Sequence, residues 1–281
     1  MQIFNNKASL NNYLSSLGSI NSTIGFVPTM GALHNGHLSL LKKSLENNSV
    51  TVVSIFVNPT QFNNQEDLAK YPRTLDNDVE KVKSVSDKIV VYAPTVDDIY
   101  DGNTTSIHYN FDGLENQMEG KFRPGHFDGV GTVVKKLFEI IKPTNAYFGE
   151  KDFQQLQIVR KLTTKYKLPV TIVGCEIFRE SNGLAMSSRN ERLSIEDRNE
   201  ASLIYKTLLT AKELFGTKTA NEVSKYVINV FKNQSKFELE YFEIADEQTL
   251  KTCKRKSEII NYRAFIAVFV NNVRLIDTIS L

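Results

Sequence analysis

Two hydrophobic patterns alternate along roughly the first 175 residues of the chain. Short, nearly continuous apolar runs, as at 24–27 and 50–57, are typical of strands that are covered on both faces. Leu38, Leu41 and Leu45 recur at helical spacing between these two runs. The same criteria predict further strands at 89–92, 146–148 and 170–173, and further helices near 76–86, 129–141 and 152–166. The alternation predicts an α/β domain with a Rossmann-like, doubly wound parallel sheet.

The pattern changes after about residue 178. Helical spacing covers 194–215 and 219–233, and apolar strands follow at 237–242, 265–270 and 273–276. Helices followed by strands predict a smaller α+β domain. We therefore expect a boundary near residue 177, with an N-terminal domain at 1–177 and a C-terminal domain at 178–281.

Composition and charge exclude several classes of protein. Hydrophobic residues make up 41% and charged residues 23% of 281 residues, as in globular proteins. The net charge is +2, and both signs are scattered along the chain, whereas a nucleic-acid binder concentrates Lys and Arg on one face. No apolar run approaches the ~20 residues that span a bilayer. We expect neither a nucleic-acid nor a membrane partner, and a local site for any anionic ligand.

The cysteines and the N-terminus predict a cytoplasmic location. Cys175 and Cys253 lie far apart and lack the CxxC spacing of a metal or redox pair, so each is predicted to be a buried, inert thiol. The opening MQIFNNKASLNNYL has no basic start followed by an apolar segment, as a secretory signal would.

A His-x-Gly-His sequence links the first predicted strand to its helix, within the segment 28–37. Backbone N–H groups are unpaired at a helix start, and the helix dipole favours negative charge there. His34 and His37 can share one face, and Gly36 lets a nucleotide approach the backbone. Two imidazoles could then donate hydrogen bonds to charge that develops on phosphate oxygens. Two histidines can also occur at a helix end by chance. Here the preceding strand, Gly36 and the spacing of the two histidines all favour a nucleotide site.

Neutral amides follow the second predicted strand. Asn58 and Gln61 stand at its carboxyl end, where open α/β sheets bind ligands. Amides both donate and accept hydrogen bonds, which suits a hydroxylated acid. Asn58-Pro59 is also a common turn signal, so a purely structural role stays open.

Two further clusters offer positive charge. Lys151, in Gly-Glu-Lys-Asp at 149–152, could neutralise a phosphate, and Asp152 could accept hydrogen bonds from ribose hydroxyls, although Asp is also common in a first helical turn. Ser187, Ser188 and Arg189 lie on a loop that could close on a triphosphate and stabilise departing pyrophosphate. A polar linker between domains is the alternative for that loop.

These motifs resemble those of one family. His34-Asn35-Gly36-His37 resembles the HxGH signature of the nucleotidyltransferase superfamily, and the full 28–37 segment resembles the pantothenate synthetase family. Asn-Pro-x-Gln-Phe at 58–62, Gly-Glu-Lys-Asp at 149–152 with Gln155, and Met-Ser-Ser-Arg-Asn at 186–190 are similar to that family's motifs, in the same order. The last is similar to the KMSKS loop of class I synthetases, with Arg189 in place of the second lysine.

The resemblance implies a reaction and a set of residues. ATP and (R)-pantoate would form pantoyl adenylate and pyrophosphate, and β-alanine would then displace AMP to give pantothenate, the coenzyme A precursor. It implies catalytic roles for His34, His37, Lys151, Ser187, Ser188 and Arg189. It implies ATP binding by Met30, Gly31, Ala32, Leu33, His34, Asn35, Gly36, His37, Gly149, Glu150, Lys151, Asp152, Phe178, Met186, Ser187, Ser188 and Arg189. It implies pantoate or β-alanine binding by Asn58, Gln61 and Gln155.

Domain roles and accessory components also follow from the resemblance. Domain 1–177 would bind nucleotide and pantoate, domain 178–281 would be a lid that carries the Met-Ser-Ser-Arg-Asn loop, and the larger domain would form a homodimer. Mg²⁺ would accompany the phosphates, although no residue spacing identifies its protein ligands. Phe178 departs from the family, which has a small aliphatic residue beside the adenine.

The sequence leaves open the role of some segments that match the family, and it leaves two other functions possible. Segment 123–127 matches the family pattern without an assigned chemical step, and a charged helix surface explains Asp76 and Asp78 equally well. A nucleotidyltransferase acting on a phosphorylated acceptor would need more cations than the amide cluster offers. A non-catalytic nucleotide-binding regulator would bind ATP without releasing pyrophosphate, but both histidines and the lysine are present.

Overall fold

The computed structural model describes residues 1–18 and 22–281, which form two compact units. The first unit comprises 1–115, 120–149 and 155–175, and the second comprises 116–119, 150–154 and 176–281. Two short segments of the second unit therefore interrupt the first unit in sequence, and one of them carries Lys151.

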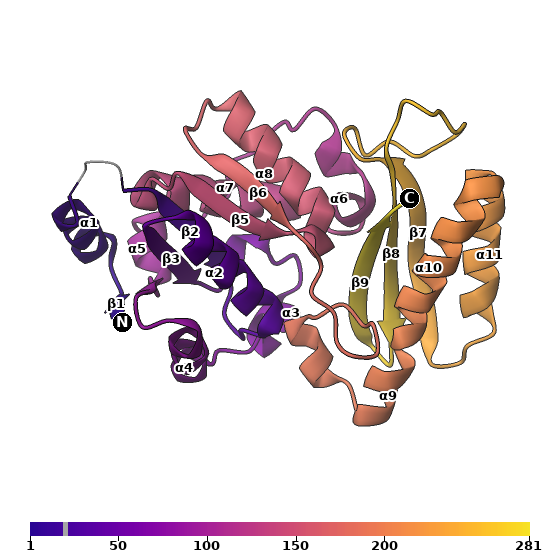
Figure 1. Cartoon of the computed structure of the whole chain (residues 1–281), viewed down its shortest axis with the longest axis horizontal. Helices are drawn as coiled ribbons and strands as arrows, with labels where there is room; N and C mark the ends of the chain where they lie inside the picture. The colour runs from indigo at the N-terminus through magenta and orange to yellow at the C-terminus, as the bar shows by residue number, and fades with distance from the viewer. Residues whose placement is uncertain (19–21) are drawn as a thin grey trace. The chain divides into compact units, whose positions relative to one another are not determined.

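A parallel sheet forms the centre of the first unit (Figure 1). Its strand order is β1-β4-β3-β2-β5-β6, and every pair is parallel. The strands are β1 (Gln2–Phe4), β2 (Ile24–Thr29), β3 (Val50–Ile55), β4 (Val90–Tyr92), β5 (Asn145–Gly149) and β6 (Thr171–Cys175). This confirms the predicted α/β class and parallel sheet.

Helices cover both faces of this sheet. Successive side chains of a strand point to opposite faces, so each strand packs against helices on two sides. On β2, Phe26 meets Phe138 of α7 edge-on, whereas Val27 joins Leu41 of α2 in a separate buried cluster. The helices of this part of the chain are α1 (Lys7–Ser16), α2 (Asn35–Asn47), α3 (Gln65–Lys70), α4 (Leu75–Val85), α5 (Val96–Tyr100), α6 (Met118–Phe122), α7 (His126–Ile141) and α8 (Phe153–Lys165). The single turns η1 (Pro59–Gln61) and η2 (Leu114–Asn116) lie between these helices, and the turn η3 (Glu150–Asp152) belongs to the second unit.

The strand order reverses at β2. Strand β2 pairs with β3 on one side and with β5 on the other, so the chain winds outward in both directions from this point. Open α/β sheets bind ligands at such a switch point, beyond the carboxyl ends of the strands. The loop after β2, which carries the two histidines, and the end of β5 at Gly149 flank it.

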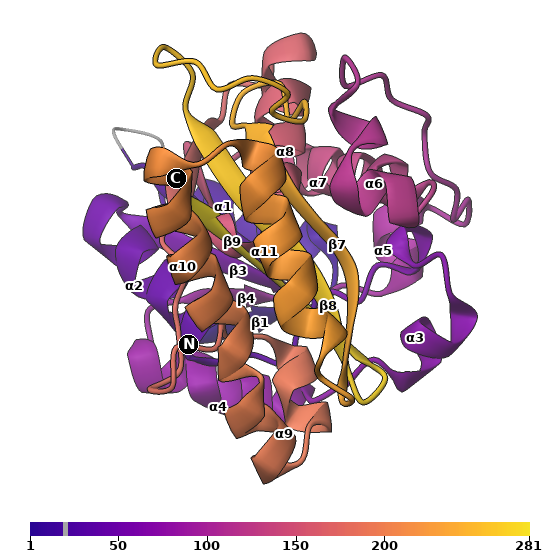
Figure 2. The ribbon, with the colours of Figure 1, turned by 90° about the vertical axis from the view of Figure 1, so that its right-hand side faces the viewer.

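The second unit contains an antiparallel sheet of β7 (Phe237–Asp246), β8 (Tyr262–Val270) and β9 (Val273–Ser280). Helices α10 (Ser202–Thr217) and α11 (Ala220–Lys232) lie side by side on one face of it (Figure 2). Leu208 and Val227 from the helices and Ile266 from β8 are fully buried together. This confirms the smaller α+β fold, which also includes α9 (Ile195–Glu200) and η4 (Ser188–Arg192).

Several features differ from the predicted elements. Strand β1 and helix α1 were not predicted, because the short segment Gln2–Phe4 is mostly exposed and shows no strand pattern of its own. The single helix predicted at 194–215 is two helices that meet at Ala201. Strand β8 begins at Tyr262 rather than at 265, since the buried Arg263 interrupts the apolar run in sequence.

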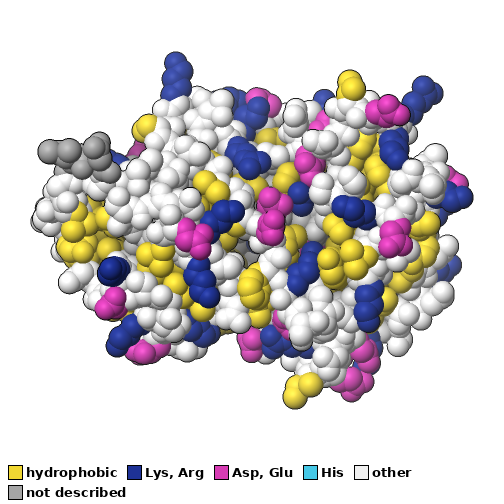
Figure 3. All heavy atoms as spheres, viewed as in Figure 1, with side chains coloured by type: hydrophobic (Ala, Val, Ile, Leu, Met, Phe, Trp, Pro, Cys, Tyr) yellow, Lys and Arg dark blue, Asp and Glu magenta, His cyan; other side chains and the backbone are white. Residues whose placement is uncertain are grey.

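Acidic and basic side chains are interspersed on the face drawn in Figure 3. Cys175 and Cys253 are both buried, and neither forms a disulfide bond. Among the helices of residues 1–18 and 22–281, none combines the length and the apolar character needed to cross a membrane.

Candidate active site

The two histidines of the first motif cap the start of α2. The Nδ1 atom of His34 accepts a hydrogen bond from the Gly36 N–H at 3.1 Å, and Nδ1 of His37 accepts one from the His34 N–H at 3.3 Å. A neutral imidazole carries one proton, so both rings must be protonated on Nε2. The ring centroids are 4.0 Å apart. The helix start therefore holds two adjacent imidazoles, each with an Nε2–H donor, where the helix dipole favours an anion.

A buried carboxylate shapes the loop that precedes these histidines. Gly31 and Ala32 both have positive φ angles, of 83° and 49°. Asp78 on α4 accepts the N–H groups of Ala32 at 2.9 Å and Leu33 at 2.7 Å, and it is 0% exposed. A charged helix surface, one of the explanations that the sequence left open for Asp78, is ruled out because this side chain is buried. Residues four apart share a helix face, and Asp78 stands four residues before the apolar Val82, which is also buried on α4. This spacing was the sequence signal that Asp78 is buried.

The variant Asp78→Asn is expected to lose about 1–3 kcal/mol of folding free energy, because an amide NH2 would face a backbone N–H that then stays unsatisfied. It should also slow turnover, since the loop between β2 and α2 would no longer be held. Urea unfolding measures the first effect and pyrophosphate release the second. Asp76→Asn, on the exposed part of the same helix, is the matched control, and equal behaviour of the two variants would contradict a loop-holding role.

The amide cluster after β3 is organised around Asn58, which is only 1% exposed. Its Nδ2 donates to Oε1 of Gln61 at 3.0 Å and to the Gly129 carbonyl at 3.3 Å. Its Oδ1 accepts the Tyr100 hydroxyl at 2.6 Å and the Thr60 hydroxyl at 3.1 Å. The Asn58 amide thus makes internal contacts on both sides and sets the orientation of the Gln61 amide.

The Gln61 backbone is held from α7. Nδ1 of His126 lies 2.9 Å from the Gln61 carbonyl oxygen, which can only accept, so this ring is protonated on Nδ1. The Nε2 of His126 can then accept from the Arg123 guanidinium, 3.5 Å away. Arg123 and His126 had no assigned step, and their contacts indicate that they position the turn that carries Gln61.

The first two motifs meet within the first unit. Nε2 of Gln61 lies 3.1 Å from the sulfur of Met30, and η1 follows β3 directly beside the loop that follows β2. Gly149 at the end of β5 and Gln155 on α8 belong to the same unit, and Gln155 is half-buried. The structure thus brings a predicted ATP-binding residue into contact with a predicted pantoate-binding residue.

In the second unit, η3 presents Lys151 on a turn that is fixed from both sides. Arg263 of β8 donates to the Glu150 carboxylate at 3.3 Å, and its guanidinium lies 4.0 Å over the ring of Phe153. Lys151 itself forms a loose ion pair with Asp152 at 3.7 Å. Arg263 was not singled out in the sequence, where a lone arginine in a strand gave no signal.

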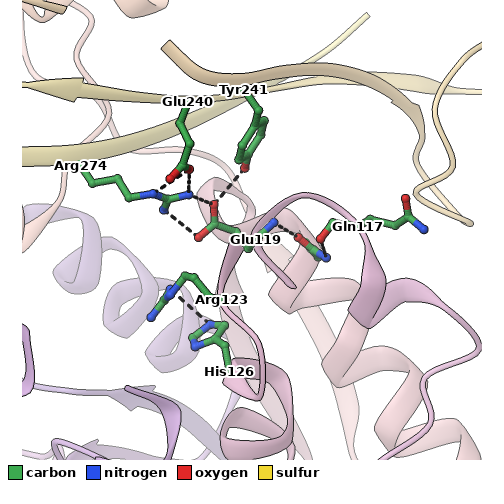
Figure 4. A network of polar contacts seen from close by, with 8 residues as sticks. Gln117, Glu119, Arg123, His126, Glu240, Tyr241 and Arg274 are labelled. Atoms are coloured by element: carbon green, nitrogen blue, oxygen red, sulfur yellow. Dashed lines mark hydrogen bonds and ion pairs between the residues drawn. The ribbon is translucent and has the colours of Figure 1, made fainter. Parts of the chain in front are cut away.

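A network of polar contacts also supports the segment next to the turn that carries Lys151 (Figure 4). Arg274 of β9 donates to both carboxylate oxygens of Glu119, at 2.6 and 2.9 Å, and also pairs with Glu240. The Tyr241 hydroxyl donates to Glu119 at 3.0 Å, and burial together with the Glu119 charge raises the pKa of Tyr241. Gln154 accepts the Glu119 N–H at 2.9 Å, so segments 116–119 and 150–154 are tied to each other and to the sheet.

The Met-Ser-Ser-Arg-Asn loop follows a hairpin whose stem is the bridge between Arg179 and Ala185. Ser187 caps η4 by accepting the Arg189 N–H at 3.3 Å. Asn190 anchors the end of the loop by donating to the Glu180 carboxylate at 2.7 Å. Phe178, just before the hairpin, is 42% exposed. The loop is thus a short helical turn held at both ends.

The whole chain matches one protein family. The model of the family described as pantoate-beta-alanine ligase matches residues 2–280. The chain belongs to this ligase family. The pantothenate synthetase of Flavobacterium psychrophilum is 68% identical over 281 residues, covering 100% of both chains. That of Christiangramia forsetii is 54% identical, over 100% of this chain and 99% of the relative.

Solved structures of ligases from this family have the same fold. The pantothenate synthetase of Thermus thermophilus superposes with a TM-score of 0.90 at 36% identity, covering 99% of each chain. The pantoate-beta-alanine ligase of Francisella tularensis, solved in complex with beta-gamma ATP and beta-alanine, superposes with a TM-score of 0.82 at 37% identity. The superposition covers 97% of the Francisella tularensis chain and 100% of this chain. The family, the enzyme class and the Rossmann-like fold that the motifs predicted are therefore confirmed.

Proposed function

We propose that this ligase condenses pantoate with β-alanine in two steps at the expense of ATP. In the first, a pantoate carboxylate oxygen attacks the α-phosphorus of ATP, the bond to the β-phosphate oxygen breaks, and pantoyl adenylate and pyrophosphate form. In the second, the β-alanine amine attacks the activated carbonyl, and AMP leaves as the amide of pantothenate forms. The observation that carries the proposal is the pair of Nε2–H donors at the start of α2.

His34 and His37 are proposed to stabilise the first transition state. Negative charge builds on the phosphate oxygens as the carboxylate attacks, and a donor that is already oriented needs no reorganisation at that moment. The backbone caps fix both rings in the required tautomer before ATP arrives. The loop residues Met30, Gly31, Ala32, Leu33, Asn35 and Gly36 are proposed to line the nucleotide together with them.

Lys151 and Arg189 are proposed to neutralise the phosphates. Lys151 supplies a point charge, and Arg189 supplies a planar guanidinium suited to pyrophosphate oxygens. Ser187 and Ser188 add hydroxyl donors, and Asp152 is proposed to bind the ribose. Gly149, Glu150, Phe178 and Met186 complete the proposed ATP contacts, with Phe178 beside the adenine.

Gln61 and Gln155 are proposed to bind pantoate through their side-chain amides. Neutral amides can pair with both hydroxyl and carboxylate groups of this acid. Asn58 is proposed to act through Gln61, because both ends of its amide already have internal partners. A phosphorylated acceptor would instead require cations at this position.

Several accessory features stay predictions. We propose that Mg²⁺ enters as MgATP, since this ion commonly takes oxygen ligands from substrate phosphates. Within the described ranges 1–18 and 22–281, no group of three or more His, Cys, Asp or Glu side chains could hold a metal ion. A homodimer through the larger domain and a cytoplasmic location remain implied by the family resemblance and the sequence. Light scattering of the purified chain would test the dimer.

The decisive experiment separates the two steps. ATP and pantoate alone should release pyrophosphate in a single turnover, and AMP and amide should appear only after β-alanine is added. ATP binding without pyrophosphate release would indicate a nucleotide-binding regulator. Release that depends on a phosphorylated acceptor instead of pantoate would indicate a nucleotidyltransferase.

A further inference from the structure

Strand β9 supports both cation-bearing segments of the second unit. It packs against η3, which carries Lys151, and against η4, which carries Ser188 and Arg189. One ionisable side chain on this strand, Asp277, is only 4% exposed. A carboxylate this deeply buried needs a compensating charge, and the proposed chemistry gives it no step.

Asp277 finds that charge at the stem of the hairpin that precedes the Met-Ser-Ser-Arg-Asn loop. Its two carboxylate oxygens accept hydrogen bonds from Arg179 at 2.6 and 3.0 Å, a bidentate arrangement. The Arg179 guanidinium also donates to the Gly183 carbonyl at 3.1 Å and lies 3.6 Å over the ring of Tyr205. Arg179 is bridged to Ala185, two residues before the first serine of the loop. The ion pair therefore fixes the stem of the hairpin to β9.

The turn η3, which carries Lys151, packs against the same strand as the hairpin loop's η4. Burial raises the pKa of Asp277, and Arg179, the Thr278 N–H and, least of all, the charge of Lys151 oppose that rise. The Thr278 N–H donates to Asp277 at 2.7 Å. The strand that carries this buried carboxylate thus contacts two segments that are separated in sequence, η3 and η4.

We propose that Asp277 is a positioning residue for the ATP phosphates. Through Arg179 it holds the stem of the loop that carries Ser187, Ser188 and Arg189 to β9, the strand on which the turn carrying Lys151 also packs. This inference rests on the proposed roles of Lys151 and Arg189 in ATP binding. Its physical basis is preorganisation: donors held in place before ATP binds lose less conformational entropy when they contact its phosphates than donors that ATP itself must order.

A purely structural role for the pair makes a different prediction. Replacing both members of a buried ion pair by well-packed apolar side chains of similar volume is often neutral for stability, whereas removing only the arginine leaves an unpaired buried charge. The double variant Arg179→Met/Asp277→Leu should therefore fold, while Arg179→Met alone should be strongly destabilised. If the pair only stabilises the fold, the double variant should recover activity together with stability.

The test measures pyrophosphate release by the full chain with ATP and pantoate. We expect the double variant to keep a melting temperature close to that of the parent chain but to raise KM for ATP about tenfold or more. The KM for pantoate should not change, because Gln61 is held by Asn58 and His126 and not by the ion pair. The control Val227→Ala removes buried volume from α11 but leaves both members of the ion pair unchanged, and should lower the melting temperature without changing KM for ATP.

A parent-like KM for ATP in the folded double variant would overturn the proposal. Arg179→Lys provides a second measurement should the double variant not fold, since it keeps the charge but loses the bidentate geometry. It too should raise KM for ATP, and a parent-like value there would equally overturn the proposal. Lys151→Met separates this inference from the proposed function. If Lys151→Met is impaired and the Asp277 and Arg179 variants are not, only the positioning role fails, whereas a parent-like Lys151→Met refutes the ATP role of Lys151 itself.

Discussion

The variant His37→Ala is expected to release pyrophosphate about a hundredfold more slowly than the parent chain, or slower still, with its fold intact. Loss of one preorganised donor to a charged transition state typically costs a factor of this size. His37 also caps α2 by accepting the His34 N–H, so the alanine variant loses some stability as well. Single-turnover release with ATP and pantoate measures the effect directly.

Two controls separate chemistry from capping. Glutamine at this third helical position can also accept the backbone N–H, as in a capping box, so His37→Gln should regain stability while turnover stays low. His108→Ala removes an exposed imidazole, 86% of whose side-chain surface is accessible, and should leave turnover unchanged. Recovery of turnover in His37→Gln would reduce the role of His37 to that of a helix cap.

The variant Gly129→Ala is expected to lose about 1–3 kcal/mol of folding free energy and to bind pantoate much more weakly. A Cβ atom at this position of α7 would lie 2.3 Å from the Thr60 carbonyl oxygen and 2.6 Å from the Gln61 backbone. Because these neighbours are backbone atoms, α7 and η1 must separate, and overpacking of this kind costs that amount. The displaced turn would also break the contact from Asn58 to the Gly129 carbonyl. Urea unfolding and KM for pantoate measure the two effects.

Gly216→Ala is the matched control for this variant. Gly216 also lies in a helix, α10, but a Cβ atom there would meet nothing within 4 Å. Helix propensity alone favours alanine over glycine by about 1 kcal/mol, so Gly216→Ala should be neutral or slightly stabilising. If Gly129→Ala behaved in the same way, the close approach of α7 to η1 would not matter for the site.

The sequence by itself determined five of the six strands of the parallel sheet, in their order along the chain, and the place of the first motif. An apolar run such as 50–57 predicts a buried strand, and β3 (Val50–Ile55) lies within it. His34 and His37 were predicted to share the start of a helix, and they cap α2. These features depend on residues within about one helical turn of each other, so local spacing is sufficient to predict them.

Only the tertiary structure decided which polar side chains are buried and what they hold. Asp78 contacts a backbone N–H 46 positions away, Asn58 a carbonyl 71 positions away, and Asp277 a guanidinium 98 positions away. In the sequence these residues look like the polar residues of a helix surface, a turn and a strand. Their partners are set by how helices and strands pack, and a single sequence carries no local signal of contacts across such distances.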